Sequence, residues 1–219
     1  MSDLMRQLDA SGFVHLREPS SWPAFVGLAR ELGELVLESD IRIDPERASK
    51  ALKPEELRFH NDSPEVAFIG WHCVEQDPVD GASLLLDTAE IAERFSAAEL
   101  EVLRTIDLQY PDLGRHDPDR GVFAYRQAPL LSAPGFRHQV YYAPWHRRLD
   151  SYDGEQLRLL ARFEEWLEER ERTAQIRIRL APGESLLIDN RRMLHGRAAL
   201  TPDSRRLLKR IWIRPVPAA

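Results

Sequence analysis

The sequence contains a single cysteine, Cys73, so no disulfide can form within one chain, which fits a reducing compartment. No apolar stretch approaches the roughly 20 residues that a membrane helix needs. The N-terminus shows no basic segment followed by an apolar run, so we expect no signal peptide. Basic residues are not in excess, because 30 Lys and Arg stand against 36 Asp and Glu. This balance favours neither nucleic acid nor a membrane as a partner, and we expect a cytoplasmic protein.

The remaining composition is that of an ordinary globular domain. The chain has 219 residues, of which 43% are hydrophobic. This length suits a single domain over residues 1–219 with a sizeable core. Ser96 and Glu99 form a capping box, which marks the start of a helix, and Asp153 and Gln156 are candidates for a second box. Apolar periodicity and capping signals together predict helices over residues 3–10, 22–37, 96–106 and 153–172.

The rest of the chain consists mainly of short apolar or alternating segments separated by turns. Examples are "VAFIGWHCV", "SLLLD", "SLLIDN" and "RRLLKRIWIRP". This order is not the regular strand and helix alternation of a doubly wound sheet. It favours a mainly β fold with flanking α-helices, as in an antiparallel barrel or jelly roll. Residues 39–57 are polar without a clear period, so we expect a surface loop there, and a candidate lid because it leads into His60.

The stretch "LRFHNDS" places His60 and Asp62 two positions apart. In an extended segment such residues share a face, so one imidazole and one carboxylate can bind the same metal. A His-x-Asp triplet is also common in surface turns, so this pair requires a third ligand. His195, in "LLIDNRRMLHGRAAL", is the candidate, because an apolar strand and a polar bend precede it. Gly196 removes side-chain bulk beside it.

Two histidines and one carboxylate form a facial triad that suits Fe(II) with open positions for a cosubstrate and dioxygen. Zinc also binds this ligand set, so the ligands alone leave the metal open. Arg206 and Arg210 follow His195 and share one face of the expected last strand. The alternation in "RRLLKRIWIR" indicates a buried face, and a buried arginine needs an anionic partner such as the distal carboxylate of a 2-oxo acid. The alternative is a solvated basic edge.

The motifs "FHND", "DGASLLLD", "LLIDNRRMLHGR" and "RRLLKRIWIR", in this order over about 60–214, resemble the taurine-dioxygenase/TfdA-like superfamily. This superfamily includes the clavaminate-synthase-like enzymes and uses Fe(II) and 2-oxoglutarate. The resemblance implies a double-stranded β-helix, a cupin-like distorted jelly roll with the metal at one mouth. It also implies Fe(II) as the cofactor, with 2-oxoglutarate and O2 as cosubstrates.

The resemblance also assigns roles to single residues. The three that look like iron ligands are His60, Asp62 and His195. Arg206 looks like the partner of the distal carboxylate of 2-oxoglutarate. Arg210 sits where family members use a second arginine near the cosubstrate or near an anionic group of the substrate. Ser83 falls where the family often has a threonine that binds the same distal carboxylate.

The implied reaction couples the conversion of 2-oxoglutarate to succinate and CO2 with hydroxylation or desaturation of an unactivated C–H bond. The carboxylate at Asp62 argues against halogenation, because halogenases of this type carry a small residue there. The chain departs from the family in its short length, which implies trimmed lid loops. It also carries Asn61 where many members have threonine.

The substrate is expected to be a small polar molecule, because no long apolar groove is evident. Family analogy favours an amino acid, free or bound to a carrier. The candidate contacts are Asn61, Arg126, Tyr141, Tyr142, Trp145 and Arg210. The alternative assigns these aromatics to the core and the arginines to the surface. We place His138 and His146 in loops or at the surface, and the oligomeric state is left open.

Two other functions fit parts of the sequence. A cupin-like metal-dependent hydrolase or isomerase would use the same three ligands but would leave Arg206 without a role. A non-catalytic ligand-binding jelly roll would tolerate the loss of any ligand, and all three candidates are present.

Overall fold

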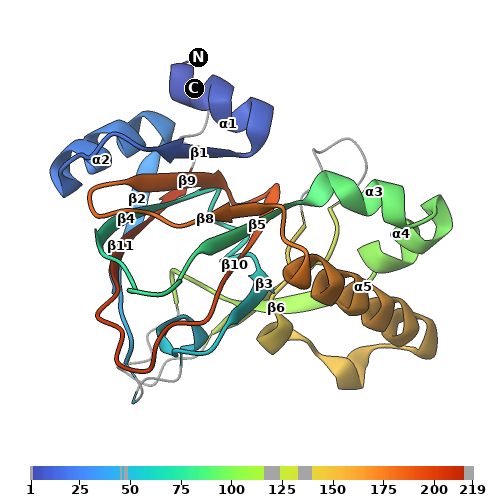
Figure 1. The fold of residues 1–219 in the computed structure, drawn as a ribbon. Coiled ribbons are helices and arrows are strands. Elements are labelled where there is room, and N and C mark those ends of the chain that lie inside the picture. The colour runs from blue at the N-terminus through green and yellow to red at the C-terminus, as the bar shows by residue number, and fades with distance from the viewer. Residues whose placement is uncertain (1, 45, 47–48, 116–123, 133–139, 215–219) are drawn as a thin grey trace.

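The computed structural model describes residues 2–44, 46, 49–115, 124–132 and 140–214, and in it two antiparallel sheets form a barrel (Figure 1). The larger sheet has the order β1 (Phe13–Leu16), β9 (Ser185–Asp189), β4 (Phe68–Glu75), β11 (Leu207–Arg214) and β2 (Glu34–Ile41). The smaller has the order β3 (Leu57–His60), β10 (Met193–Arg197), β5 (Ser83–Asp87) and β8 (Ile176–Ile178). A separate ribbon pairs β6 (Asp107–Pro111) with β7 (Tyr125–Pro129).

The space between the two main sheets is filled by apolar side chains from both of them. Leu85 of the smaller sheet and Ile69 of the larger sheet belong to one buried cluster. Both faces of β11 carry buried residues. Leu208 joins this cluster between the sheets, whereas Ile211 points to the opposite face and packs outside the barrel. The fold is therefore mainly β with helices outside it, which confirms the expected fold class.

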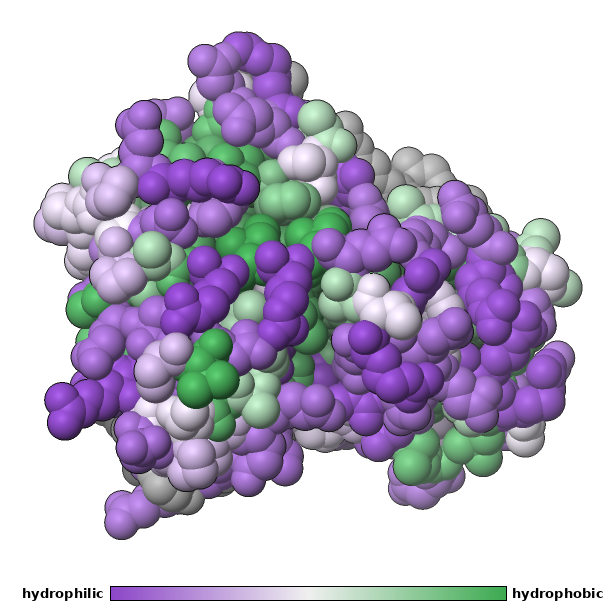
Figure 2. All heavy atoms as spheres, in the orientation of Figure 1, coloured by the Kyte–Doolittle hydropathy of each residue, from purple (hydrophilic) through white to green (hydrophobic). Residues whose placement is uncertain are grey.

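Helices cover both sides of the barrel. α1 (Asp3–Ser11) and α2 (Trp22–Ala29) pack their apolar residues against the outer face of the larger sheet. The smaller sheet shares a second core with α3 (Ile91–Arg94), α4 (Ala97–Arg104) and α5 (Gly154–Arg172). The region around α5 presents mainly hydrophilic side chains outward (Figure 2). None of the described helices has the length and apolar character needed to cross a membrane.

Both capping boxes that the sequence indicated are formed. Ser96 accepts from the backbone N–H of Glu99, whose side chain accepts from the Ser96 N–H in return. The same reciprocal pair joins Asp153 and Gln156 at the start of α5. These bonds satisfy backbone donors that have no partner inside the helix, which explains why both starts could be located from the sequence.

The helix expected over residues 22–37 is shorter than predicted. α2 ends at Ala29, a 3-10 turn η1 (Arg30–Leu32) follows, and after Gly33 the chain enters β2. β2 pairs with β11 from Glu34 to Ile41. A short apolar run such as "ELVL" is compatible with either a helix or a strand. Here it forms a strand, because its backbone pairs with the edge of β11. The expected loop therefore begins only after Ile41, and it contains a 3-10 turn, η2 (Lys50–Leu52).

Candidate active site

Two neighbouring strands of the smaller sheet bring the predicted histidine ligands together. His60 of β3 lies directly opposite His195 of β10, and their ring centroids are 4.2 Å apart. Both side chains are buried. The next residue, Gly196, packs so closely that an added Cβ would lie 2.7 Å from the carbonyl oxygen of Leu57. A side chain at this position would push β3 away from β10, so glycine allows the two histidines to meet.

Asp62 lies two residues beyond His60, in a turn held by two buried asparagines. The side-chain amide of Asn61 forms hydrogen bonds with three backbone groups of neighbouring segments. The side chain of Asn190 accepts from the Asp62 N–H at 3.1 Å and donates to two carbonyls of the same turn. The position of the Asp62 carboxylate is therefore fixed by the protein itself.

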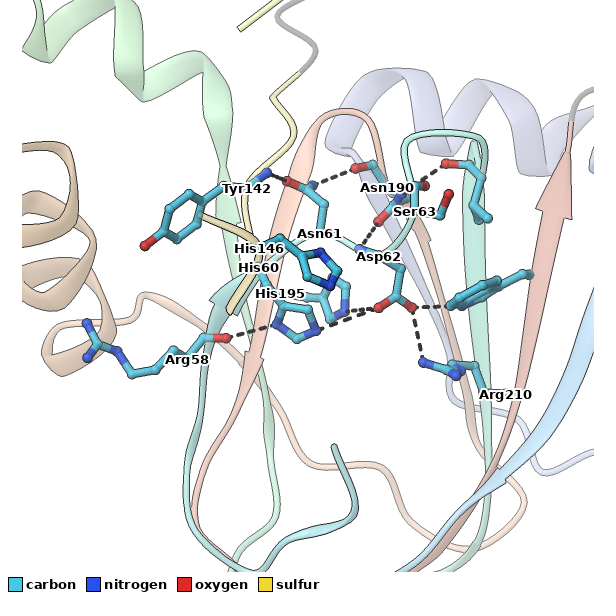
Figure 3. Close-up of polar contacts among 12 residues, drawn as sticks. Arg58, His60, Asn61, Asp62, Ser63, Tyr142, His146, Asn190, His195 and Arg210 are labelled. Atoms are coloured by element: carbon cyan, nitrogen blue, oxygen red, sulfur yellow. Dashed lines mark hydrogen bonds and ion pairs between the residues drawn. The ribbon is translucent and has the colours of Figure 1, made fainter. Parts of the chain in front are cut away.

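The three side chains converge on one point (Figure 3). Oδ1 of Asp62 lies 3.7 Å from Nε2 of His60 and 3.9 Å from Nε2 of His195, and one ligand atom from each lies within 4.8 Å of the others. Nδ1 of His60 is 2.9 Å from the carbonyl oxygen of Arg58, which can only accept. Nδ1 therefore carries the proton and Nε2 offers its lone pair to a metal. This donor set fits Fe(II).

The second oxygen of Asp62 is held by two donors on β11. Oδ2 accepts from Nη1 of Arg210 at 3.1 Å and from Nε1 of Trp212 at 2.7 Å, which leaves Oδ1 for a metal. Burial alone would raise the pKa of Asp62, but the charge of Arg210, the two histidines and the Trp212 N–H lower it overall. Burial also lowers the pKa of His60, and it lowers the pKa of His195 to about 3. At neutral pH the carboxylate is ionised and the imidazoles are neutral, as metal binding requires.

An inner cavity lies on one side of these ligands. It is lined by Ile41, Ala51, Leu57, His60, Trp71, Ser83, His195, Gly196, Arg197, Arg206, Leu208 and Arg210. Arg206 is 4% exposed, and no carboxylate among the described residues lies within ion-pair distance of it. Burial lowers its pKa to about 10, and the neighbouring charge of Arg197 adds to this effect. The structure thus brings Ser83 and Arg206 together beside the three ligands.

An outer cavity opens beside the same ligands. Its lining includes Ser49, Lys50, Ala51, Leu57, His60, Asn61, Asp62, Ser63, Pro111, Leu113, Tyr141, Trp145, His146, Arg210 and Trp212. The Trp145 ring lies over His60, with 4.9 Å between the ring centroids. The Tyr141 hydroxyl lies 2.8 Å from Nδ1 of His146. Aromatic rings and small polar groups therefore surround the side of the ligands that faces away from Arg206.

The predicted substrate contacts separate into two groups. Trp145 and Arg210 line the outer cavity, and Asn61 borders it with an amide already committed to the backbone. Tyr142 points away from the ligands (Figure 3), and its hydroxyl donates to Glu164 at 2.9 Å inside the second core. Arg126 lines neither cavity and pairs with Asp112 and Glu65. For Tyr142 and Arg126 the structure therefore supports the alternative positions, in the core and at the surface.

Sequence reasoning missed two residues of the site. Trp212 contacts Asp62, whereas the sequence points only to Arg206 and Arg210 in this segment. The signal was present, because Trp212 continues the same alternation two positions after Arg210. His146 lines the outer cavity from a connecting segment, so its expected loop position holds, but its place in the site was not predicted. No local pattern marks His146, since the short 3-10 turn η5 (Pro144–His146) places it. His138 lies outside the described residues.

A barrel of this kind that groups two histidines and an aspartate is typical of the non-haem iron oxygenases. The family model described as "Taurine catabolism dioxygenase TauD, TfdA family" matches residues 1–212, and the chain belongs to this family. The protein is therefore an Fe(II)- and 2-oxoglutarate-dependent dioxygenase. No curated protein sequence matches the chain.

Solved structures of similar fold include asparagine oxygenase in complex with Fe(II), 2S,3S-3-hydroxyasparagine and succinate. It is 17% identical to this chain with a TM-score of 0.76, and the match covers 97% of this chain and 78% of that one. The non-heme iron oxygenase OrfP in complex with Fe and alpha-ketoglutaric acid is 17% identical with a TM-score of 0.68, covering 96% and 77%. The likeness shows the double-stranded β-helix fold. Family membership supports the oxygenase hypothesis over the hydrolase, isomerase and non-catalytic alternatives.

Proposed function

We propose that this enzyme hydroxylates, or desaturates, an unactivated C–H bond of a small, amino-acid-like metabolite. His60, Asp62 and His195 would hold Fe(II). The observation that carries the proposal is the position of the three ligand atoms between two cavities of different character. The inner cavity would receive 2-oxoglutarate and the outer cavity the substrate, so that both reach the metal from different sides.

The inner cavity suits a molecule with a carboxylate at its far end. Arg206 offers a buried guanidinium with no carboxylate partner among the described residues, and the Ser83 hydroxyl lines the same space. An arginine fork binds a carboxylate through two parallel hydrogen bonds. Arg210 instead contacts Asp62, so we assign it to the metal ligand, with its charge available to both cavities.

When bound, Fe(II) would supply the dioxygen chemistry: one oxygen atom enters succinate as CO2 leaves, and the other enters the substrate in a hydroxylation or leaves as water in a desaturation. The residues of the chain hold and enclose the reactants. Arg210 and Trp212 keep one oxygen of Asp62 occupied, so the carboxylate binds the metal through the other. Trp145 packs beside the His60 ring and forms part of the wall on the substrate side.

The outer cavity supports a small polar substrate. Its lining combines the amine of Lys50 and the hydroxyl of Ser63 with aromatic walls from Tyr141 and Trp145. One structure of similar fold holds 3-hydroxyasparagine, and a variant of OrfP holds (3S)-hydroxy-L-Arg. These bound hydroxylated amino acids support an amino acid as the substrate class, and we propose that its carboxylate lies near Lys50. The amino acid could be free or bound to a carrier.

The test begins with an anaerobic titration of the purified enzyme with Fe(II) and then 2-oxoglutarate. A weak visible charge-transfer band is expected for the wild type and should be absent in His195→Ala. Oxygen is then admitted with a panel of free and carrier-bound amino acids, and succinate is quantified. Succinate that forms in step with a hydroxylated or desaturated amino acid supports the proposal. A wild type without the band, or succinate release that no panel member stimulates, would contradict it.

A further inference from the structure

We infer that Gln76 is a positioning residue for the cosubstrate. It orients the guanidinium of Arg206 toward the inner cavity without forming an ion pair with it. This inference rests on the proposed binding of 2-oxoglutarate at Arg206. Gln76 does not line the inner cavity, so it can affect the cosubstrate only through Arg206.

The ladder between β4 and β11 places the two side chains opposite each other. The last paired residues are Glu75 of β4 and Leu207 of β11. Gln76 is the first residue after β4 and Arg206 is the last before β11, so both lie just beyond this pair. Oε1 of Gln76 accepts a hydrogen bond from Nε of Arg206 at 3.1 Å. The contact therefore follows from strand register.

The Gln76 amide has only one favourable orientation. Its Nε2 donates to the carbonyl oxygen of Leu180 at 2.9 Å, and its Oε1 also accepts from the Asp77 N–H at 2.9 Å. A flipped amide would place a donor against both N–H groups. Gly81 packs closely against both side chains, because an added Cβ there would lie 2.9 Å from Oε1 of Gln76 and 3.1 Å from Cδ of Arg206.

The neighbouring Asp77 fixes the chain segment that carries Arg206. Its carboxylate is fully buried and accepts from both the N–H and the hydroxyl of Thr201, each at 2.9 Å. The other carboxylate oxygen accepts from the N–H groups of Val79 and Asp80. The end of β4 is thereby joined to the turn before β11. Gln76 thus acts on an arginine whose backbone is already held in place.

Gln76 uses only one of the nitrogens of Arg206. The two terminal nitrogens form no hydrogen bond with the described residues, yet neither is sealed from solvent, and Arg206 lines the inner cavity. They are thus free to bind a carboxylate as a fork. A glutamate at position 76 would form an ion pair with Arg206 and would repel an incoming anion. Glutamine supplies the same acceptor oxygen without that charge.

The experiment compares two ligands that differ in one group. Dissociation constants of 2-oxoglutarate and of 2-oxopentanoate, which lacks the distal carboxylate, are measured by anaerobic calorimetry on the Fe(II)-loaded enzyme. Gln76→Leu should weaken 2-oxoglutarate binding about tenfold, as expected for one charge-assisted hydrogen bond. It should leave 2-oxopentanoate binding unchanged. Gln76→Glu should also weaken 2-oxoglutarate binding, although it keeps an acceptor oxygen.

Controls separate orientation from general damage to the fold. Glu75→Ala, at the exposed preceding position, should leave both dissociation constants unchanged. All variants should keep the wild-type Fe(II) affinity. Gln76→Leu also loses the hydrogen bonds to Leu180 and Asp77, so its thermal unfolding temperature should fall, and its unchanged affinity for 2-oxopentanoate then shows that the site is intact. In an Arg206→Ala background, Gln76→Leu should cause no further loss, because the two residues act through one contact.

Three results would overturn the inference about Gln76 alone. These are an equal loss of affinity for both ligands, 2-oxoglutarate binding in Gln76→Glu as tight as in the wild type, and an undiminished effect of Gln76→Leu in the Arg206→Ala background. If Arg206→Ala itself leaves 2-oxoglutarate binding unchanged, the proposed cosubstrate site is wrong, and the inference fails with it.

Discussion

The inner and outer cavities share the metal ligands but are built from different kinds of structure. On the inner side, Ser83 and Arg197 lie within strands β5 and β10, and Arg206 directly precedes β11. On the outer side, Trp145 lies in the 3-10 turn η5 and Lys50 in η2. Hydrogen-bonded strands thus position key residues of the inner cavity, whereas connecting segments form much of the outer cavity.

This difference matches what each cavity is proposed to bind. The inner cavity is proposed to bind a single cosubstrate, 2-oxoglutarate, so a rigid wall is sufficient on that side. Substrates differ, and loops on a fixed scaffold can change without disturbing the sheets. The two cavities meet at Ala51 and Leu57, which line both, and at the ligand His60. Four predictions sharpen this comparison.

The largest effect is expected from the shared ligands in the metal-free protein. His195 has a folded-state pKa of about 3, far below the ordinary value near 6.5. Between these values the unfolded chain binds a proton that the folded chain does not, so stability falls as the pH falls. From pH 6.5 to 4.5, His195 alone should lower the free energy of unfolding by roughly 2 kcal/mol.

The pKa of His60 is lowered too, and this adds to the slope. Urea unfolding of the metal-free protein at several pH values measures the effect. His195→Gln should show a shallower dependence on pH. A wild-type free energy of unfolding that stays constant over this range would show that the ligands are not buried in their neutral form.

The next effect concerns the boundary between the cavities. The buried Arg197 donates to the backbone carbonyls of Ala51 at 3.1 Å, of Lys53 at 2.7 Å and of Glu55. Arg197→Met removes a charged donor from all three, and we expect the free energy of unfolding to fall by about 3 kcal/mol. Arg205→Met, at an exposed position, should change it by less than about 0.5 kcal/mol. If urea unfolding shows the same loss of free energy for Arg197→Met and Arg205→Met, the bonds from Arg197 to this connecting segment do not stabilise the fold.

A smaller effect is expected from the second donor to Asp62. Trp212→Phe keeps the aromatic ring but removes the N–H that donates to Oδ2 at 2.7 Å. Fe(II) affinity should fall about tenfold, because outer contacts of this kind orient the ligand. Anaerobic metal titration measures it. Trp22→Phe, on the far side of the larger sheet, is the control and should bind Fe(II) like the wild type. An unchanged affinity in Trp212→Phe would assign the orientation of Asp62 to Arg210 alone.

The smallest effect compares two adjacent tyrosines. Tyr141 faces the outer cavity, whereas Tyr142 faces Glu164 in the core. Tyr141→Phe removes the hydrogen bond to His146 and should raise the KM for the substrate about fivefold, with the KM for 2-oxoglutarate unchanged. Tyr142→Phe should leave both constants unchanged and cost about 1 kcal/mol of stability. If Tyr142→Phe changes the substrate KM and Tyr141→Phe does not, the assignment of the outer cavity is wrong.

The sequence predicted the fold most reliably where the signal was local. Capping boxes gave the starts of α4 and α5, because the bonding groups lie three residues apart. The boundary between α2 and β2 was wrong, because the apolar run there suits either structure and the edge of β11 decides between them. The same division applies to the site. The inner residues were selected by strand alternation and family motifs, but His146 comes from a loop with no such pattern.

By itself, the sequence indicated which side chains could lie close together, His60 with Asp62 and Arg206 with Arg210, because residues two or four positions apart share a face of an extended segment. Only the tertiary structure decided how these pairs are used. Register sets His60 against His195 and Gln76 against Arg206, and the packing of β11 turns Arg210 toward Asp62. These contacts join residues far apart in the chain, and no local pattern encodes the distance between them.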